Sequence, residues 1–75
     1  MRLSEAKKNN NLIISKLNIK DIKLKNYLLS LGIIENTNIK IIKTSFLNGP
    51  LIIYLNNYQL SISKTIAQQI EVDYL

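Results

Sequence analysis

Apolar residues alternate with polar ones, or gather in short blocks, along most of the chain, and this pattern is typical of β-strands. The blocks are four to seven residues long and are separated by turn-forming asparagine, glycine and serine. Five strands are predicted on this basis: Leu12–Leu17, Ile39–Lys43, Leu51–Leu55, Tyr58–Ser63 and Ile70–Tyr74. Asn56-Asn57 predicts a type I′ hairpin between the third and fourth strands, because asparagine tolerates positive φ at both turn positions.

One segment, Ile22–Leu31, has the period of a helix instead. Leu24, Leu28 and Leu31 recur at i, i+4 and i+7, so we expect one apolar stripe of this helix to pack on the core. Single helical turns are also predicted, at Leu3–Lys8 with Ser4 as N-cap and at Lys64–Gln68 opened by Ser63.

Capping and turn residues mark the ends of these elements. Asp21 can cap the start of the helix, and Gly32 stands where a helix end requires positive φ. Turns or loops are predicted at Asn9-Asn10-Asn11, Glu35-Asn36 and Ser45–Pro50. Five short strands and one helix of about ten residues predict a mainly β fold, a small closed or nearly closed barrel that forms a single domain over residues 1–75.

Composition excludes most catalytic chemistry. The chain has neither cysteine nor histidine, so it lacks the commonest general base, the commonest transition-metal ligand and a thiolate nucleophile. Its carboxylates are scattered, at Glu5, Asp21, Glu35, Glu71 and Asp73. No loop gathers two or three of them as a hard cation requires. We therefore expect no enzyme, no cofactor and no metal site.

The net charge of +5 has two interpretations. A basic domain can bind nucleic acid. Alternatively, the joint abundance of Ile, Lys and Asn reflects an AT-rich coding bias, which also favours lysine over arginine. No apolar run approaches the roughly 20 residues of a membrane span, and Met1–Asn11 lacks the apolar core of a signal peptide. We expect a complete, cytoplasmic polypeptide that does not insert directly into a membrane.

Several motifs in order resemble the FeoA family, small proteins of the bacterial ferrous iron transport system. Leu3–Glu5 resembles an opening LSEL turn, and Leu24–Ile33 resembles an LxxxLLxMGL helix with its cap. Glu35–Thr37 occupies the place of a PGT turn. Gly49-Pro50 resembles GGP at the next strand, and Asn57–Ile62 resembles GYRLAL. The resemblance covers nearly the whole chain.

The chain also departs from this pattern. Glu35-Asn36 replaces Pro-Gly, Asn57 replaces Gly, and Ser63 replaces a basic residue. The arginine-rich helix face of the family is reduced to Lys23 and Lys25 beside a neutral residue. A partner contact made by that face would be altered here.

The resemblance implies an SH3-like barrel, a fold that also forms the C-terminal domain of some iron-dependent repressors. It further implies an adaptor or regulator that binds FeoB, the membrane iron transporter, at its cytosolic GTPase domain. The protein would then be recruited to the inner face of the cytoplasmic membrane. The family as a whole is described as binding transition metal ions. We do not expect this chain to bind them directly, because it has no cysteine or histidine ligands.

Surface residues that could contact a partner follow from the strand alternation. Leu51, Ile53 and Leu55 should face inward, together with Leu60 and Ile62, which turns Ile52 and Tyr54 outward. An outward apolar pair is a candidate surface for FeoB or for self-association, unless a terminal turn covers it. The full set of candidate partner-binding residues is Ile13, Lys23, Lys25, Tyr27, Lys40, Lys43, Ile52, Tyr54 and Tyr58.

Five of these candidates, the four lysines and Tyr58, have plainer interpretations. The four lysines form either one basic face across the helix and the second strand or an ordinary solvated surface. Tyr58 is either a partner contact or an aromatic at the barrel end with its hydroxyl in water.

The alternative function is a small nucleic-acid-binding barrel, of the kind associated with ribosomes. Such a domain needs basic residues interleaved with exposed aromatic residues on one face. The aromatic residues are dispersed along the chain, at Tyr27, Phe46, Tyr54, Tyr58 and Tyr74. We therefore expect no specific nucleic-acid partner.

The first prediction concerns iron. We predict that the purified protein carries no tightly bound iron, because it has no cysteine or histidine to hold the metal. Elemental analysis after gel filtration measures this directly. Stoichiometric iron in the protein peak would contradict it.

Overall fold

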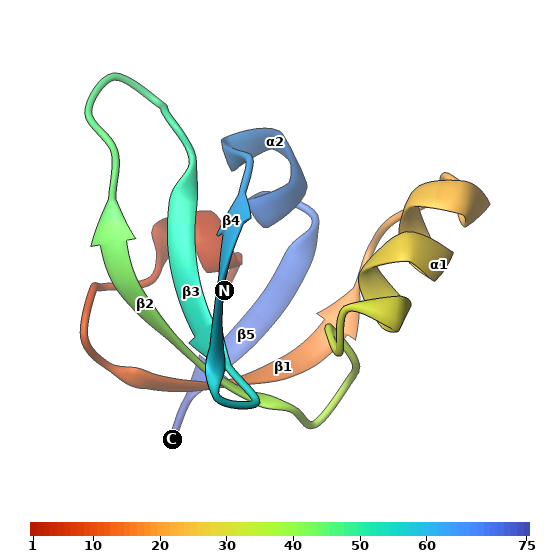
Figure 1. Ribbon diagram of the computed structural model, residues 1–75, viewed down its shortest axis with the longest axis horizontal. Coiled ribbons are helices and arrows are strands. Elements are labelled where there is room, and N and C mark those ends of the chain that lie inside the picture. The colour runs from red at the N-terminus through yellow and green to blue at the C-terminus, as the bar shows by residue number, and fades with distance from the viewer.

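One curled antiparallel sheet forms the body of the molecule. The computed structural model describes residues 1–75, and its strands lie in the order β4-β3-β2-β1-β5 (Figure 1). The strands are β1 Asn11–Leu17, β2 Asn38–Thr44, β3 Leu51–Leu55, β4 Tyr58–Ile62 and β5 Ile70–Tyr74. The predicted mainly β fold with five strands is confirmed, each strand lying within one residue of its expected bounds.

The core is entirely apolar. Sixteen residues are buried, and none of them is polar or charged. On β3 the alternation is as expected: Leu51, Ile53 and Leu55 are buried, while Tyr54 is exposed. Ile62 of β4 is also buried. Because a strand alternates its side chains between two faces, one continuous core fixes which residues face outward.

A β-bulge in β2 decides where its lysines point. Ile41 pairs with Ile53, but Lys43 pairs with Ile52, so one extra residue is accommodated at Ile42. Strict alternation would place Lys43 on the same face as buried Ile41. The bulge instead returns the lysine to the outside, opposite the outward-facing Ile52.

The hairpin between β3 and β4 turns through two left-handed asparagines. Asn56 has φ of 47° and Asn57 has φ of 68°, and Leu55 pairs with Tyr58 directly across the turn. These positive φ values at both central positions confirm the predicted type I′ turn.

Helix α1, Ile22–Ser30, projects from the barrel beside β1 (Figure 1). The Asp21 side chain caps it as predicted, accepting hydrogen bonds from the backbone N–H groups of Lys23 (3.0 Å) and Leu24 (3.3 Å). Of the predicted stripe, only Leu28 is fully buried, whereas Leu24 is half-buried. The helix therefore rests on the barrel mainly through one side chain.

The end of α1 is fixed by a Schellman motif and by the hairpin. Gly32 has φ of 91°, its N–H bonds the carbonyl of Leu29 (3.0 Å), and the N–H of Ile33 bonds the carbonyl of Leu28 (3.0 Å). The hydroxyl of Tyr58 donates to the carbonyl of Leu31. This hydroxyl is therefore engaged within the fold, and the expectation that it points into water is wrong.

The first residues form a shorter turn than expected. The 3₁₀-helix η1 spans Leu3–Glu5, and Ala6 is already extended. Ser4 lies inside this turn and Arg2 precedes it, so the prediction of Ser4 as N-cap is wrong. The turn begins at Leu3, as expected, and Leu3 is completely buried in the core. Hydrogen bonds from the Arg2 backbone and side chain to Glu5 lower the pKa of that carboxyl group.

The N-terminal residues also cover the free edge of β5. The Val72 N–H bonds the Met1 carbonyl (2.7 Å), the Met1 amino group donates back to Val72 (3.1 Å), and Arg2 forms a bridge to Glu71. Before β5, the helical turn α2, Lys64–Ala67, is capped by Ser63 as predicted. Neither α1 nor α2 has the length and apolar character needed to cross a membrane.

The second prediction concerns the packing of α1 against the barrel. Replacing Leu28 with alanine should lower the free energy of unfolding by about 2–5 kcal/mol, because it empties the only fully buried position of the helix. Urea denaturation followed by circular dichroism measures the change. Tyr27→Ala, on the exposed side of the same helix, is the control and should cost about 0.5 kcal/mol or less. Equal stability of the two variants would show that the face of α1 carrying Leu28 does not pack on the core.

The third prediction concerns the tyrosine that ties the hairpin to α1. Tyr58→Phe should cost about 0.5–1.5 kcal/mol, because it leaves the Leu31 carbonyl without its donor while keeping the ring. Tyr27→Phe, which removes an exposed hydroxyl, is the matched control. A Tyr58→Phe protein with the same denaturation midpoint as the control would show that this hydrogen bond adds no stability.

Candidate protein-docking face

The outward side of β2 and β3 forms the centre of the candidate site. Tyr54 pairs with Lys40 and Ile52 pairs with Lys43, so two apolar and two basic side chains alternate on this surface. Tyr54 is 40% exposed and Ile52 is half-buried, in agreement with the partial exposure expected for this pair. We call Ile13, Lys40, Lys43, Ile52 and Tyr54 the outer sheet face.

No terminal turn covers the apolar pair. The cross-strand neighbours of Ile52 are Lys43 on β2 and Ser61 on β4. Those of Tyr54 are Lys40 and Gln59. The pair is therefore flanked by polar side chains of the sheet itself. Tyr54 is 40% exposed, and the main contacts of η1 are with α2 and β5, so neither the N-terminal turn nor the last helical turn closes over Tyr54.

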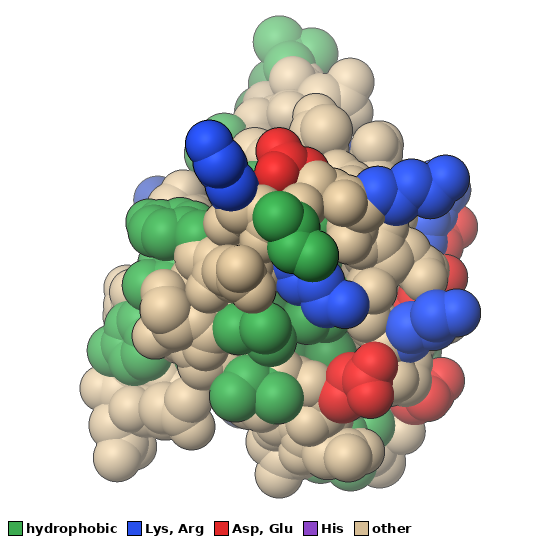
Figure 2. All heavy atoms as spheres, turned by 90° about the vertical axis from the view of Figure 1, so that its right-hand side faces the viewer, with side chains coloured by type: hydrophobic (Ala, Val, Ile, Leu, Met, Phe, Trp, Pro, Cys, Tyr) green, Lys and Arg blue, Asp and Glu red, His purple; other side chains and the backbone are tan.

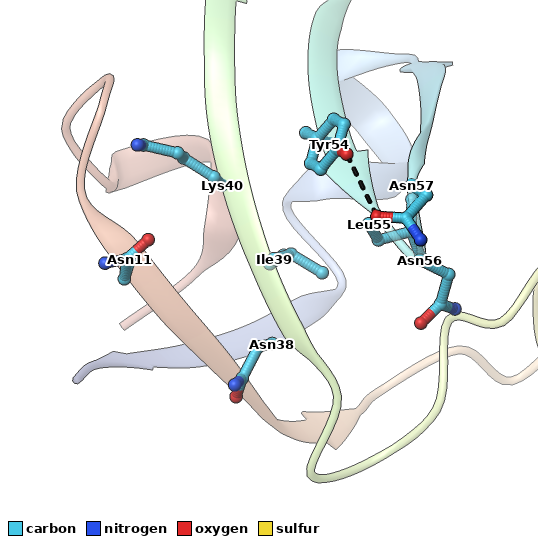
Figure 3. A pocket seen from close by; sticks show the side chains of 8 residues that line it. All are labelled: Asn11, Asn38, Ile39, Lys40, Tyr54, Leu55, Asn56 and Asn57. Atoms are coloured by element: carbon cyan, nitrogen blue, oxygen red, sulfur yellow. Dashed lines mark hydrogen bonds between the residues drawn. The ribbon is translucent and has the colours of Figure 1, made fainter.

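A cleft of about 380 Å³ lies beside Tyr54, between β2 and the turn that joins β3 to β4 (Figure 3). Its lining consists of Asn11, Asn38, Ile39, Lys40, Tyr54, Leu55, Asn56 and Asn57. The Tyr54 hydroxyl donates to Oδ1 of Asn57 (3.2 Å), which holds the ring against the turn. The cleft thus offers amide groups, a lysine and a tyrosine, and no carboxylate. Such a lining suits a polar or acidic segment of a protein partner.

Ile13 occupies a different part of the surface. It pairs with Asn38 on β2 and with Asp73 on β5, so polar residues lie on both sides of it. Asn11 and Lys40 form the next row toward Tyr54. Ile13 is therefore a half-buried edge of the outer sheet face and does not extend its apolar pair into one continuous patch.

Of the two alternatives for the four lysines, the single basic face across helix and strand is not formed. Lys23 and Lys25 lie on α1, whereas Lys40 and Lys43 lie on β2, and these elements occupy opposite sides of the molecule (Figure 1). The sequence left both alternatives open because it does not reveal that α1 projects away from β2. On the α1 side, basic, acidic and apolar side chains are interspersed (Figure 2).

The remaining aromatic candidates are also separated. Tyr27 is 60% exposed on α1, far from the outer sheet face. Tyr58 is half-buried, packs against the core and uses its hydroxyl within the fold. The structure therefore places Tyr58 in a stabilising role and gathers no aromatic platform of the kind that stacks nucleic-acid bases.

Two features of the molecular surface were not predicted from the sequence. One is the amide lining of the cleft, because Asn11, Asn38 and Asn56 come from three separate turns or strand ends. The other is the pair Phe46 and Leu47, which are 88% and 87% exposed. The sequence does contain a signal for them, because two large apolar residues lie inside the predicted loop Ser45–Pro50.

The carboxylates do not converge. No group of three or more Asp or Glu side chains is placed to hold a metal ion. Glu5 pairs with Arg2 (3.3 Å), and Glu71 lies 3.5 Å from the N-terminal amino group.

Comparisons with solved structures identify the fold. The solution structure of iron(II) transport protein A from Clostridium thermocellum superposes with a TM-score of 0.91 at 24% identity, covering 100% of this chain and 46% of that one. The crystal structure of an iron uptake regulatory protein, FeoA, gives 0.85 at 23% identity, covering 100% and 96%. A manganese-dependent transcriptional repressor gives 0.90 at 16% identity, covering 100% and 41%.

These likenesses establish an SH3-like fold that is shared by FeoA proteins and by a domain-sized part of metal-dependent repressors. No curated protein sequence matches the chain. The sequence profile described as FeoA domain, however, matches residues 1–74. A match over almost every residue is decisive, and the chain belongs to the FeoA domain family.

Proposed function

We propose that this protein is a non-enzymatic adaptor or regulator of ferrous iron uptake, which binds the cytosolic GTPase domain of a FeoB-type membrane transporter. The observation that carries the proposal is the family match over residues 1–74. Two of the solved structures with this fold are named for iron(II) transport and for regulation of iron uptake. The protein would act in the cytosol, at the inner face of the membrane that holds the transporter.

The outer sheet face is the docking surface in this proposal. It combines an aromatic residue, an aliphatic residue and two lysines with a cleft lined by amide groups. Tyrosine is enriched among the residues that dominate binding energy, because its ring buries area while its hydroxyl stays hydrogen-bonded. The lysines would favour an acidic partner surface and raise the rate of encounter.

Association is also what the chemistry of the chain supports. The chain has no cysteine or histidine, and its carboxylates lie apart. The only side chain paired with a carboxylate is Arg2, which contacts Glu5, so the structure offers no nucleophile paired with a general base, the minimum for most acyl- or phosphoryl-transfer sites. The proposed effect on transport therefore operates through the partner's own GTPase domain.

The fourth prediction tests the docking surface. The double variant Ile52→Thr, Tyr54→Lys should stay folded, because both positions are on the outer face and the buried core residues of β3 are left unchanged. We expect its affinity for the purified cytosolic region of FeoB to fall at least tenfold, about 1.4 kcal/mol. A binding titration measures the affinity, and gel filtration measures any self-association through the same pair.

The matched control is Ile22→Thr, Tyr27→Lys, which makes the same changes on exposed α1 residues at the far side. It should bind as tightly as the unaltered protein. A loss of affinity in this control but not in the first variant would move the docking surface to α1. An unaltered protein that does not bind FeoB at all would contradict the proposed function itself.

A further inference from the structure

The most exposed apolar residues of the molecule lie at the end of one loop. Phe46 and Leu47, between β2 and β3, are 88% and 87% exposed. This loop projects beyond the barrel (Figure 1), and the corresponding uppermost part of Figure 2 carries hydrophobic side chains. Large apolar side chains this far from the core contribute little to folding, and two of them side by side form a candidate interaction site.

The backbone holds these two side chains outward. Leu47 and Asn48 both have left-handed φ values, 55° and 62°, and the Gly49 N–H bonds the Phe46 carbonyl (3.3 Å). A leucine in the left-handed region is uncommon and costs backbone energy. The tight turn keeps the loop from folding back, so no other part of the chain covers the two residues.

Three lysines lie on β2 and on the segment beside it, below the tip of this loop. Lys43 precedes Phe46 by three residues and is exposed on the outer sheet face. The Asn9 N–H bonds the Ile41 carbonyl (2.8 Å), which brings the segment carrying Lys7 and Lys8 alongside β2. Neither this segment, nor β2, nor the loop contains an acidic residue. Residues Tyr74 and Leu75 of the C-terminus contact the Lys7–Asn11 segment, but Lys7, Lys8 and Lys43 form no ion pair. An apolar tip with unpaired lysines on the neighbouring segments therefore occupies one edge of the molecule.

We propose that this edge binds the surface of a membrane containing anionic lipids, with Phe46 and Leu47 inserted at the headgroup level and Lys7, Lys8 and Lys43 facing the lipid phosphates. Apolar side chains combined with basic residues are what reversible interfacial binding requires. A two-residue convex tip is too small for a stable protein interface, which buries 1,200 Å² or more in total. A fluid lipid surface, in contrast, accepts a small insertion.

This proposal does not depend on FeoB binding: the apolar tip lies outside the outer sheet face, and of the residues named only Lys43 belongs to both surfaces. It also departs from the expectation, drawn from the sequence, that the chain does not insert directly into a membrane. That expectation considered a spanning segment or a signal peptide. Interfacial binding needs neither, because a short loop and a few lysines are sufficient when the anionic lipid content is high.

The fifth prediction uses the absence of tryptophan from the chain. Phe46→Trp introduces a single tryptophan at the tip, and Tyr27→Trp places one on α1 as the control. With vesicles of 30% phosphatidylglycerol in phosphatidylcholine, emission from position 46 should shift to shorter wavelength and be quenched by brominated lipid. Emission from position 27 should not change. An unshifted, unquenched tryptophan at position 46 would overturn the insertion.

Flotation of the unaltered chain with the same vesicles tests the two parts of the proposal separately. Phe46→Ser, Leu47→Ser should abolish flotation, and Ile22→Ser, Tyr27→Ser should not. Lys8→Gln, Lys43→Gln should weaken binding by about fivefold per lysine. Lys23→Gln, Lys25→Gln has the same net charge and should weaken it much less.

The outcomes are decisive in both directions. Equal losses from the two lysine pairs would show that only the net charge matters, which contradicts an oriented edge. Binding to pure phosphatidylcholine as strong as to the anionic mixture would contradict the role of the lysines. No flotation of the unaltered protein, with loss of FeoB binding in Phe46→Ser, Leu47→Ser, would assign the tip to a protein partner instead and overturn the lipid proposal.

Discussion

The inward row of β3 is the packing on which the rest of the structure depends. Leu51, Ile53 and Leu55 are all 4% exposed or less, and β3 is hydrogen-bonded to β2 on one side and β4 on the other. Because side chains alternate, seating this row in the core places Ile52 and Tyr54 outside. The same packing orients the hairpin turn, whose two asparagines line the cleft beside Tyr54. The candidate docking face is thus a direct consequence of how the core is filled.

The fold was predictable wherever local and long-range preferences agree. The alternation of β3, the Asn56-Asn57 turn, the Asp21 cap and the glycine at the end of α1 each have a local physical cause, and each is found as expected. Ser4 failed as a cap because burial of Leu3 competes with capping preference and wins. A buried leucine is worth about 1.5–3 kcal/mol, more than a typical cap.

The candidate site was harder to predict because its members come from different strands. That Lys43 faces outward beside Ile52 depends on the bulge at Ile42, which no pattern in the sequence reveals. The separation of Lys23 from Lys40 depends on the direction in which α1 leaves the barrel. The role of Tyr58 depends on a carbonyl 27 residues away in the chain. Period and propensity predict which face a side chain takes, but not which neighbours it meets there.

The two proposed surfaces are joined along β2, and this has a consequence for how the protein would work. Lys40 lines the cleft, and Lys43 stands between the cleft and the apolar tip. A lysine that neutralises a lipid phosphate is not free to pair with an acidic partner, so Lys43 would be shared between the two contacts. Membrane binding would then orient the outer sheet face beside the membrane surface, where the cytosolic region of a membrane transporter lies. It would also concentrate the protein near that partner, which strengthens a weak interface without adding any contact to it.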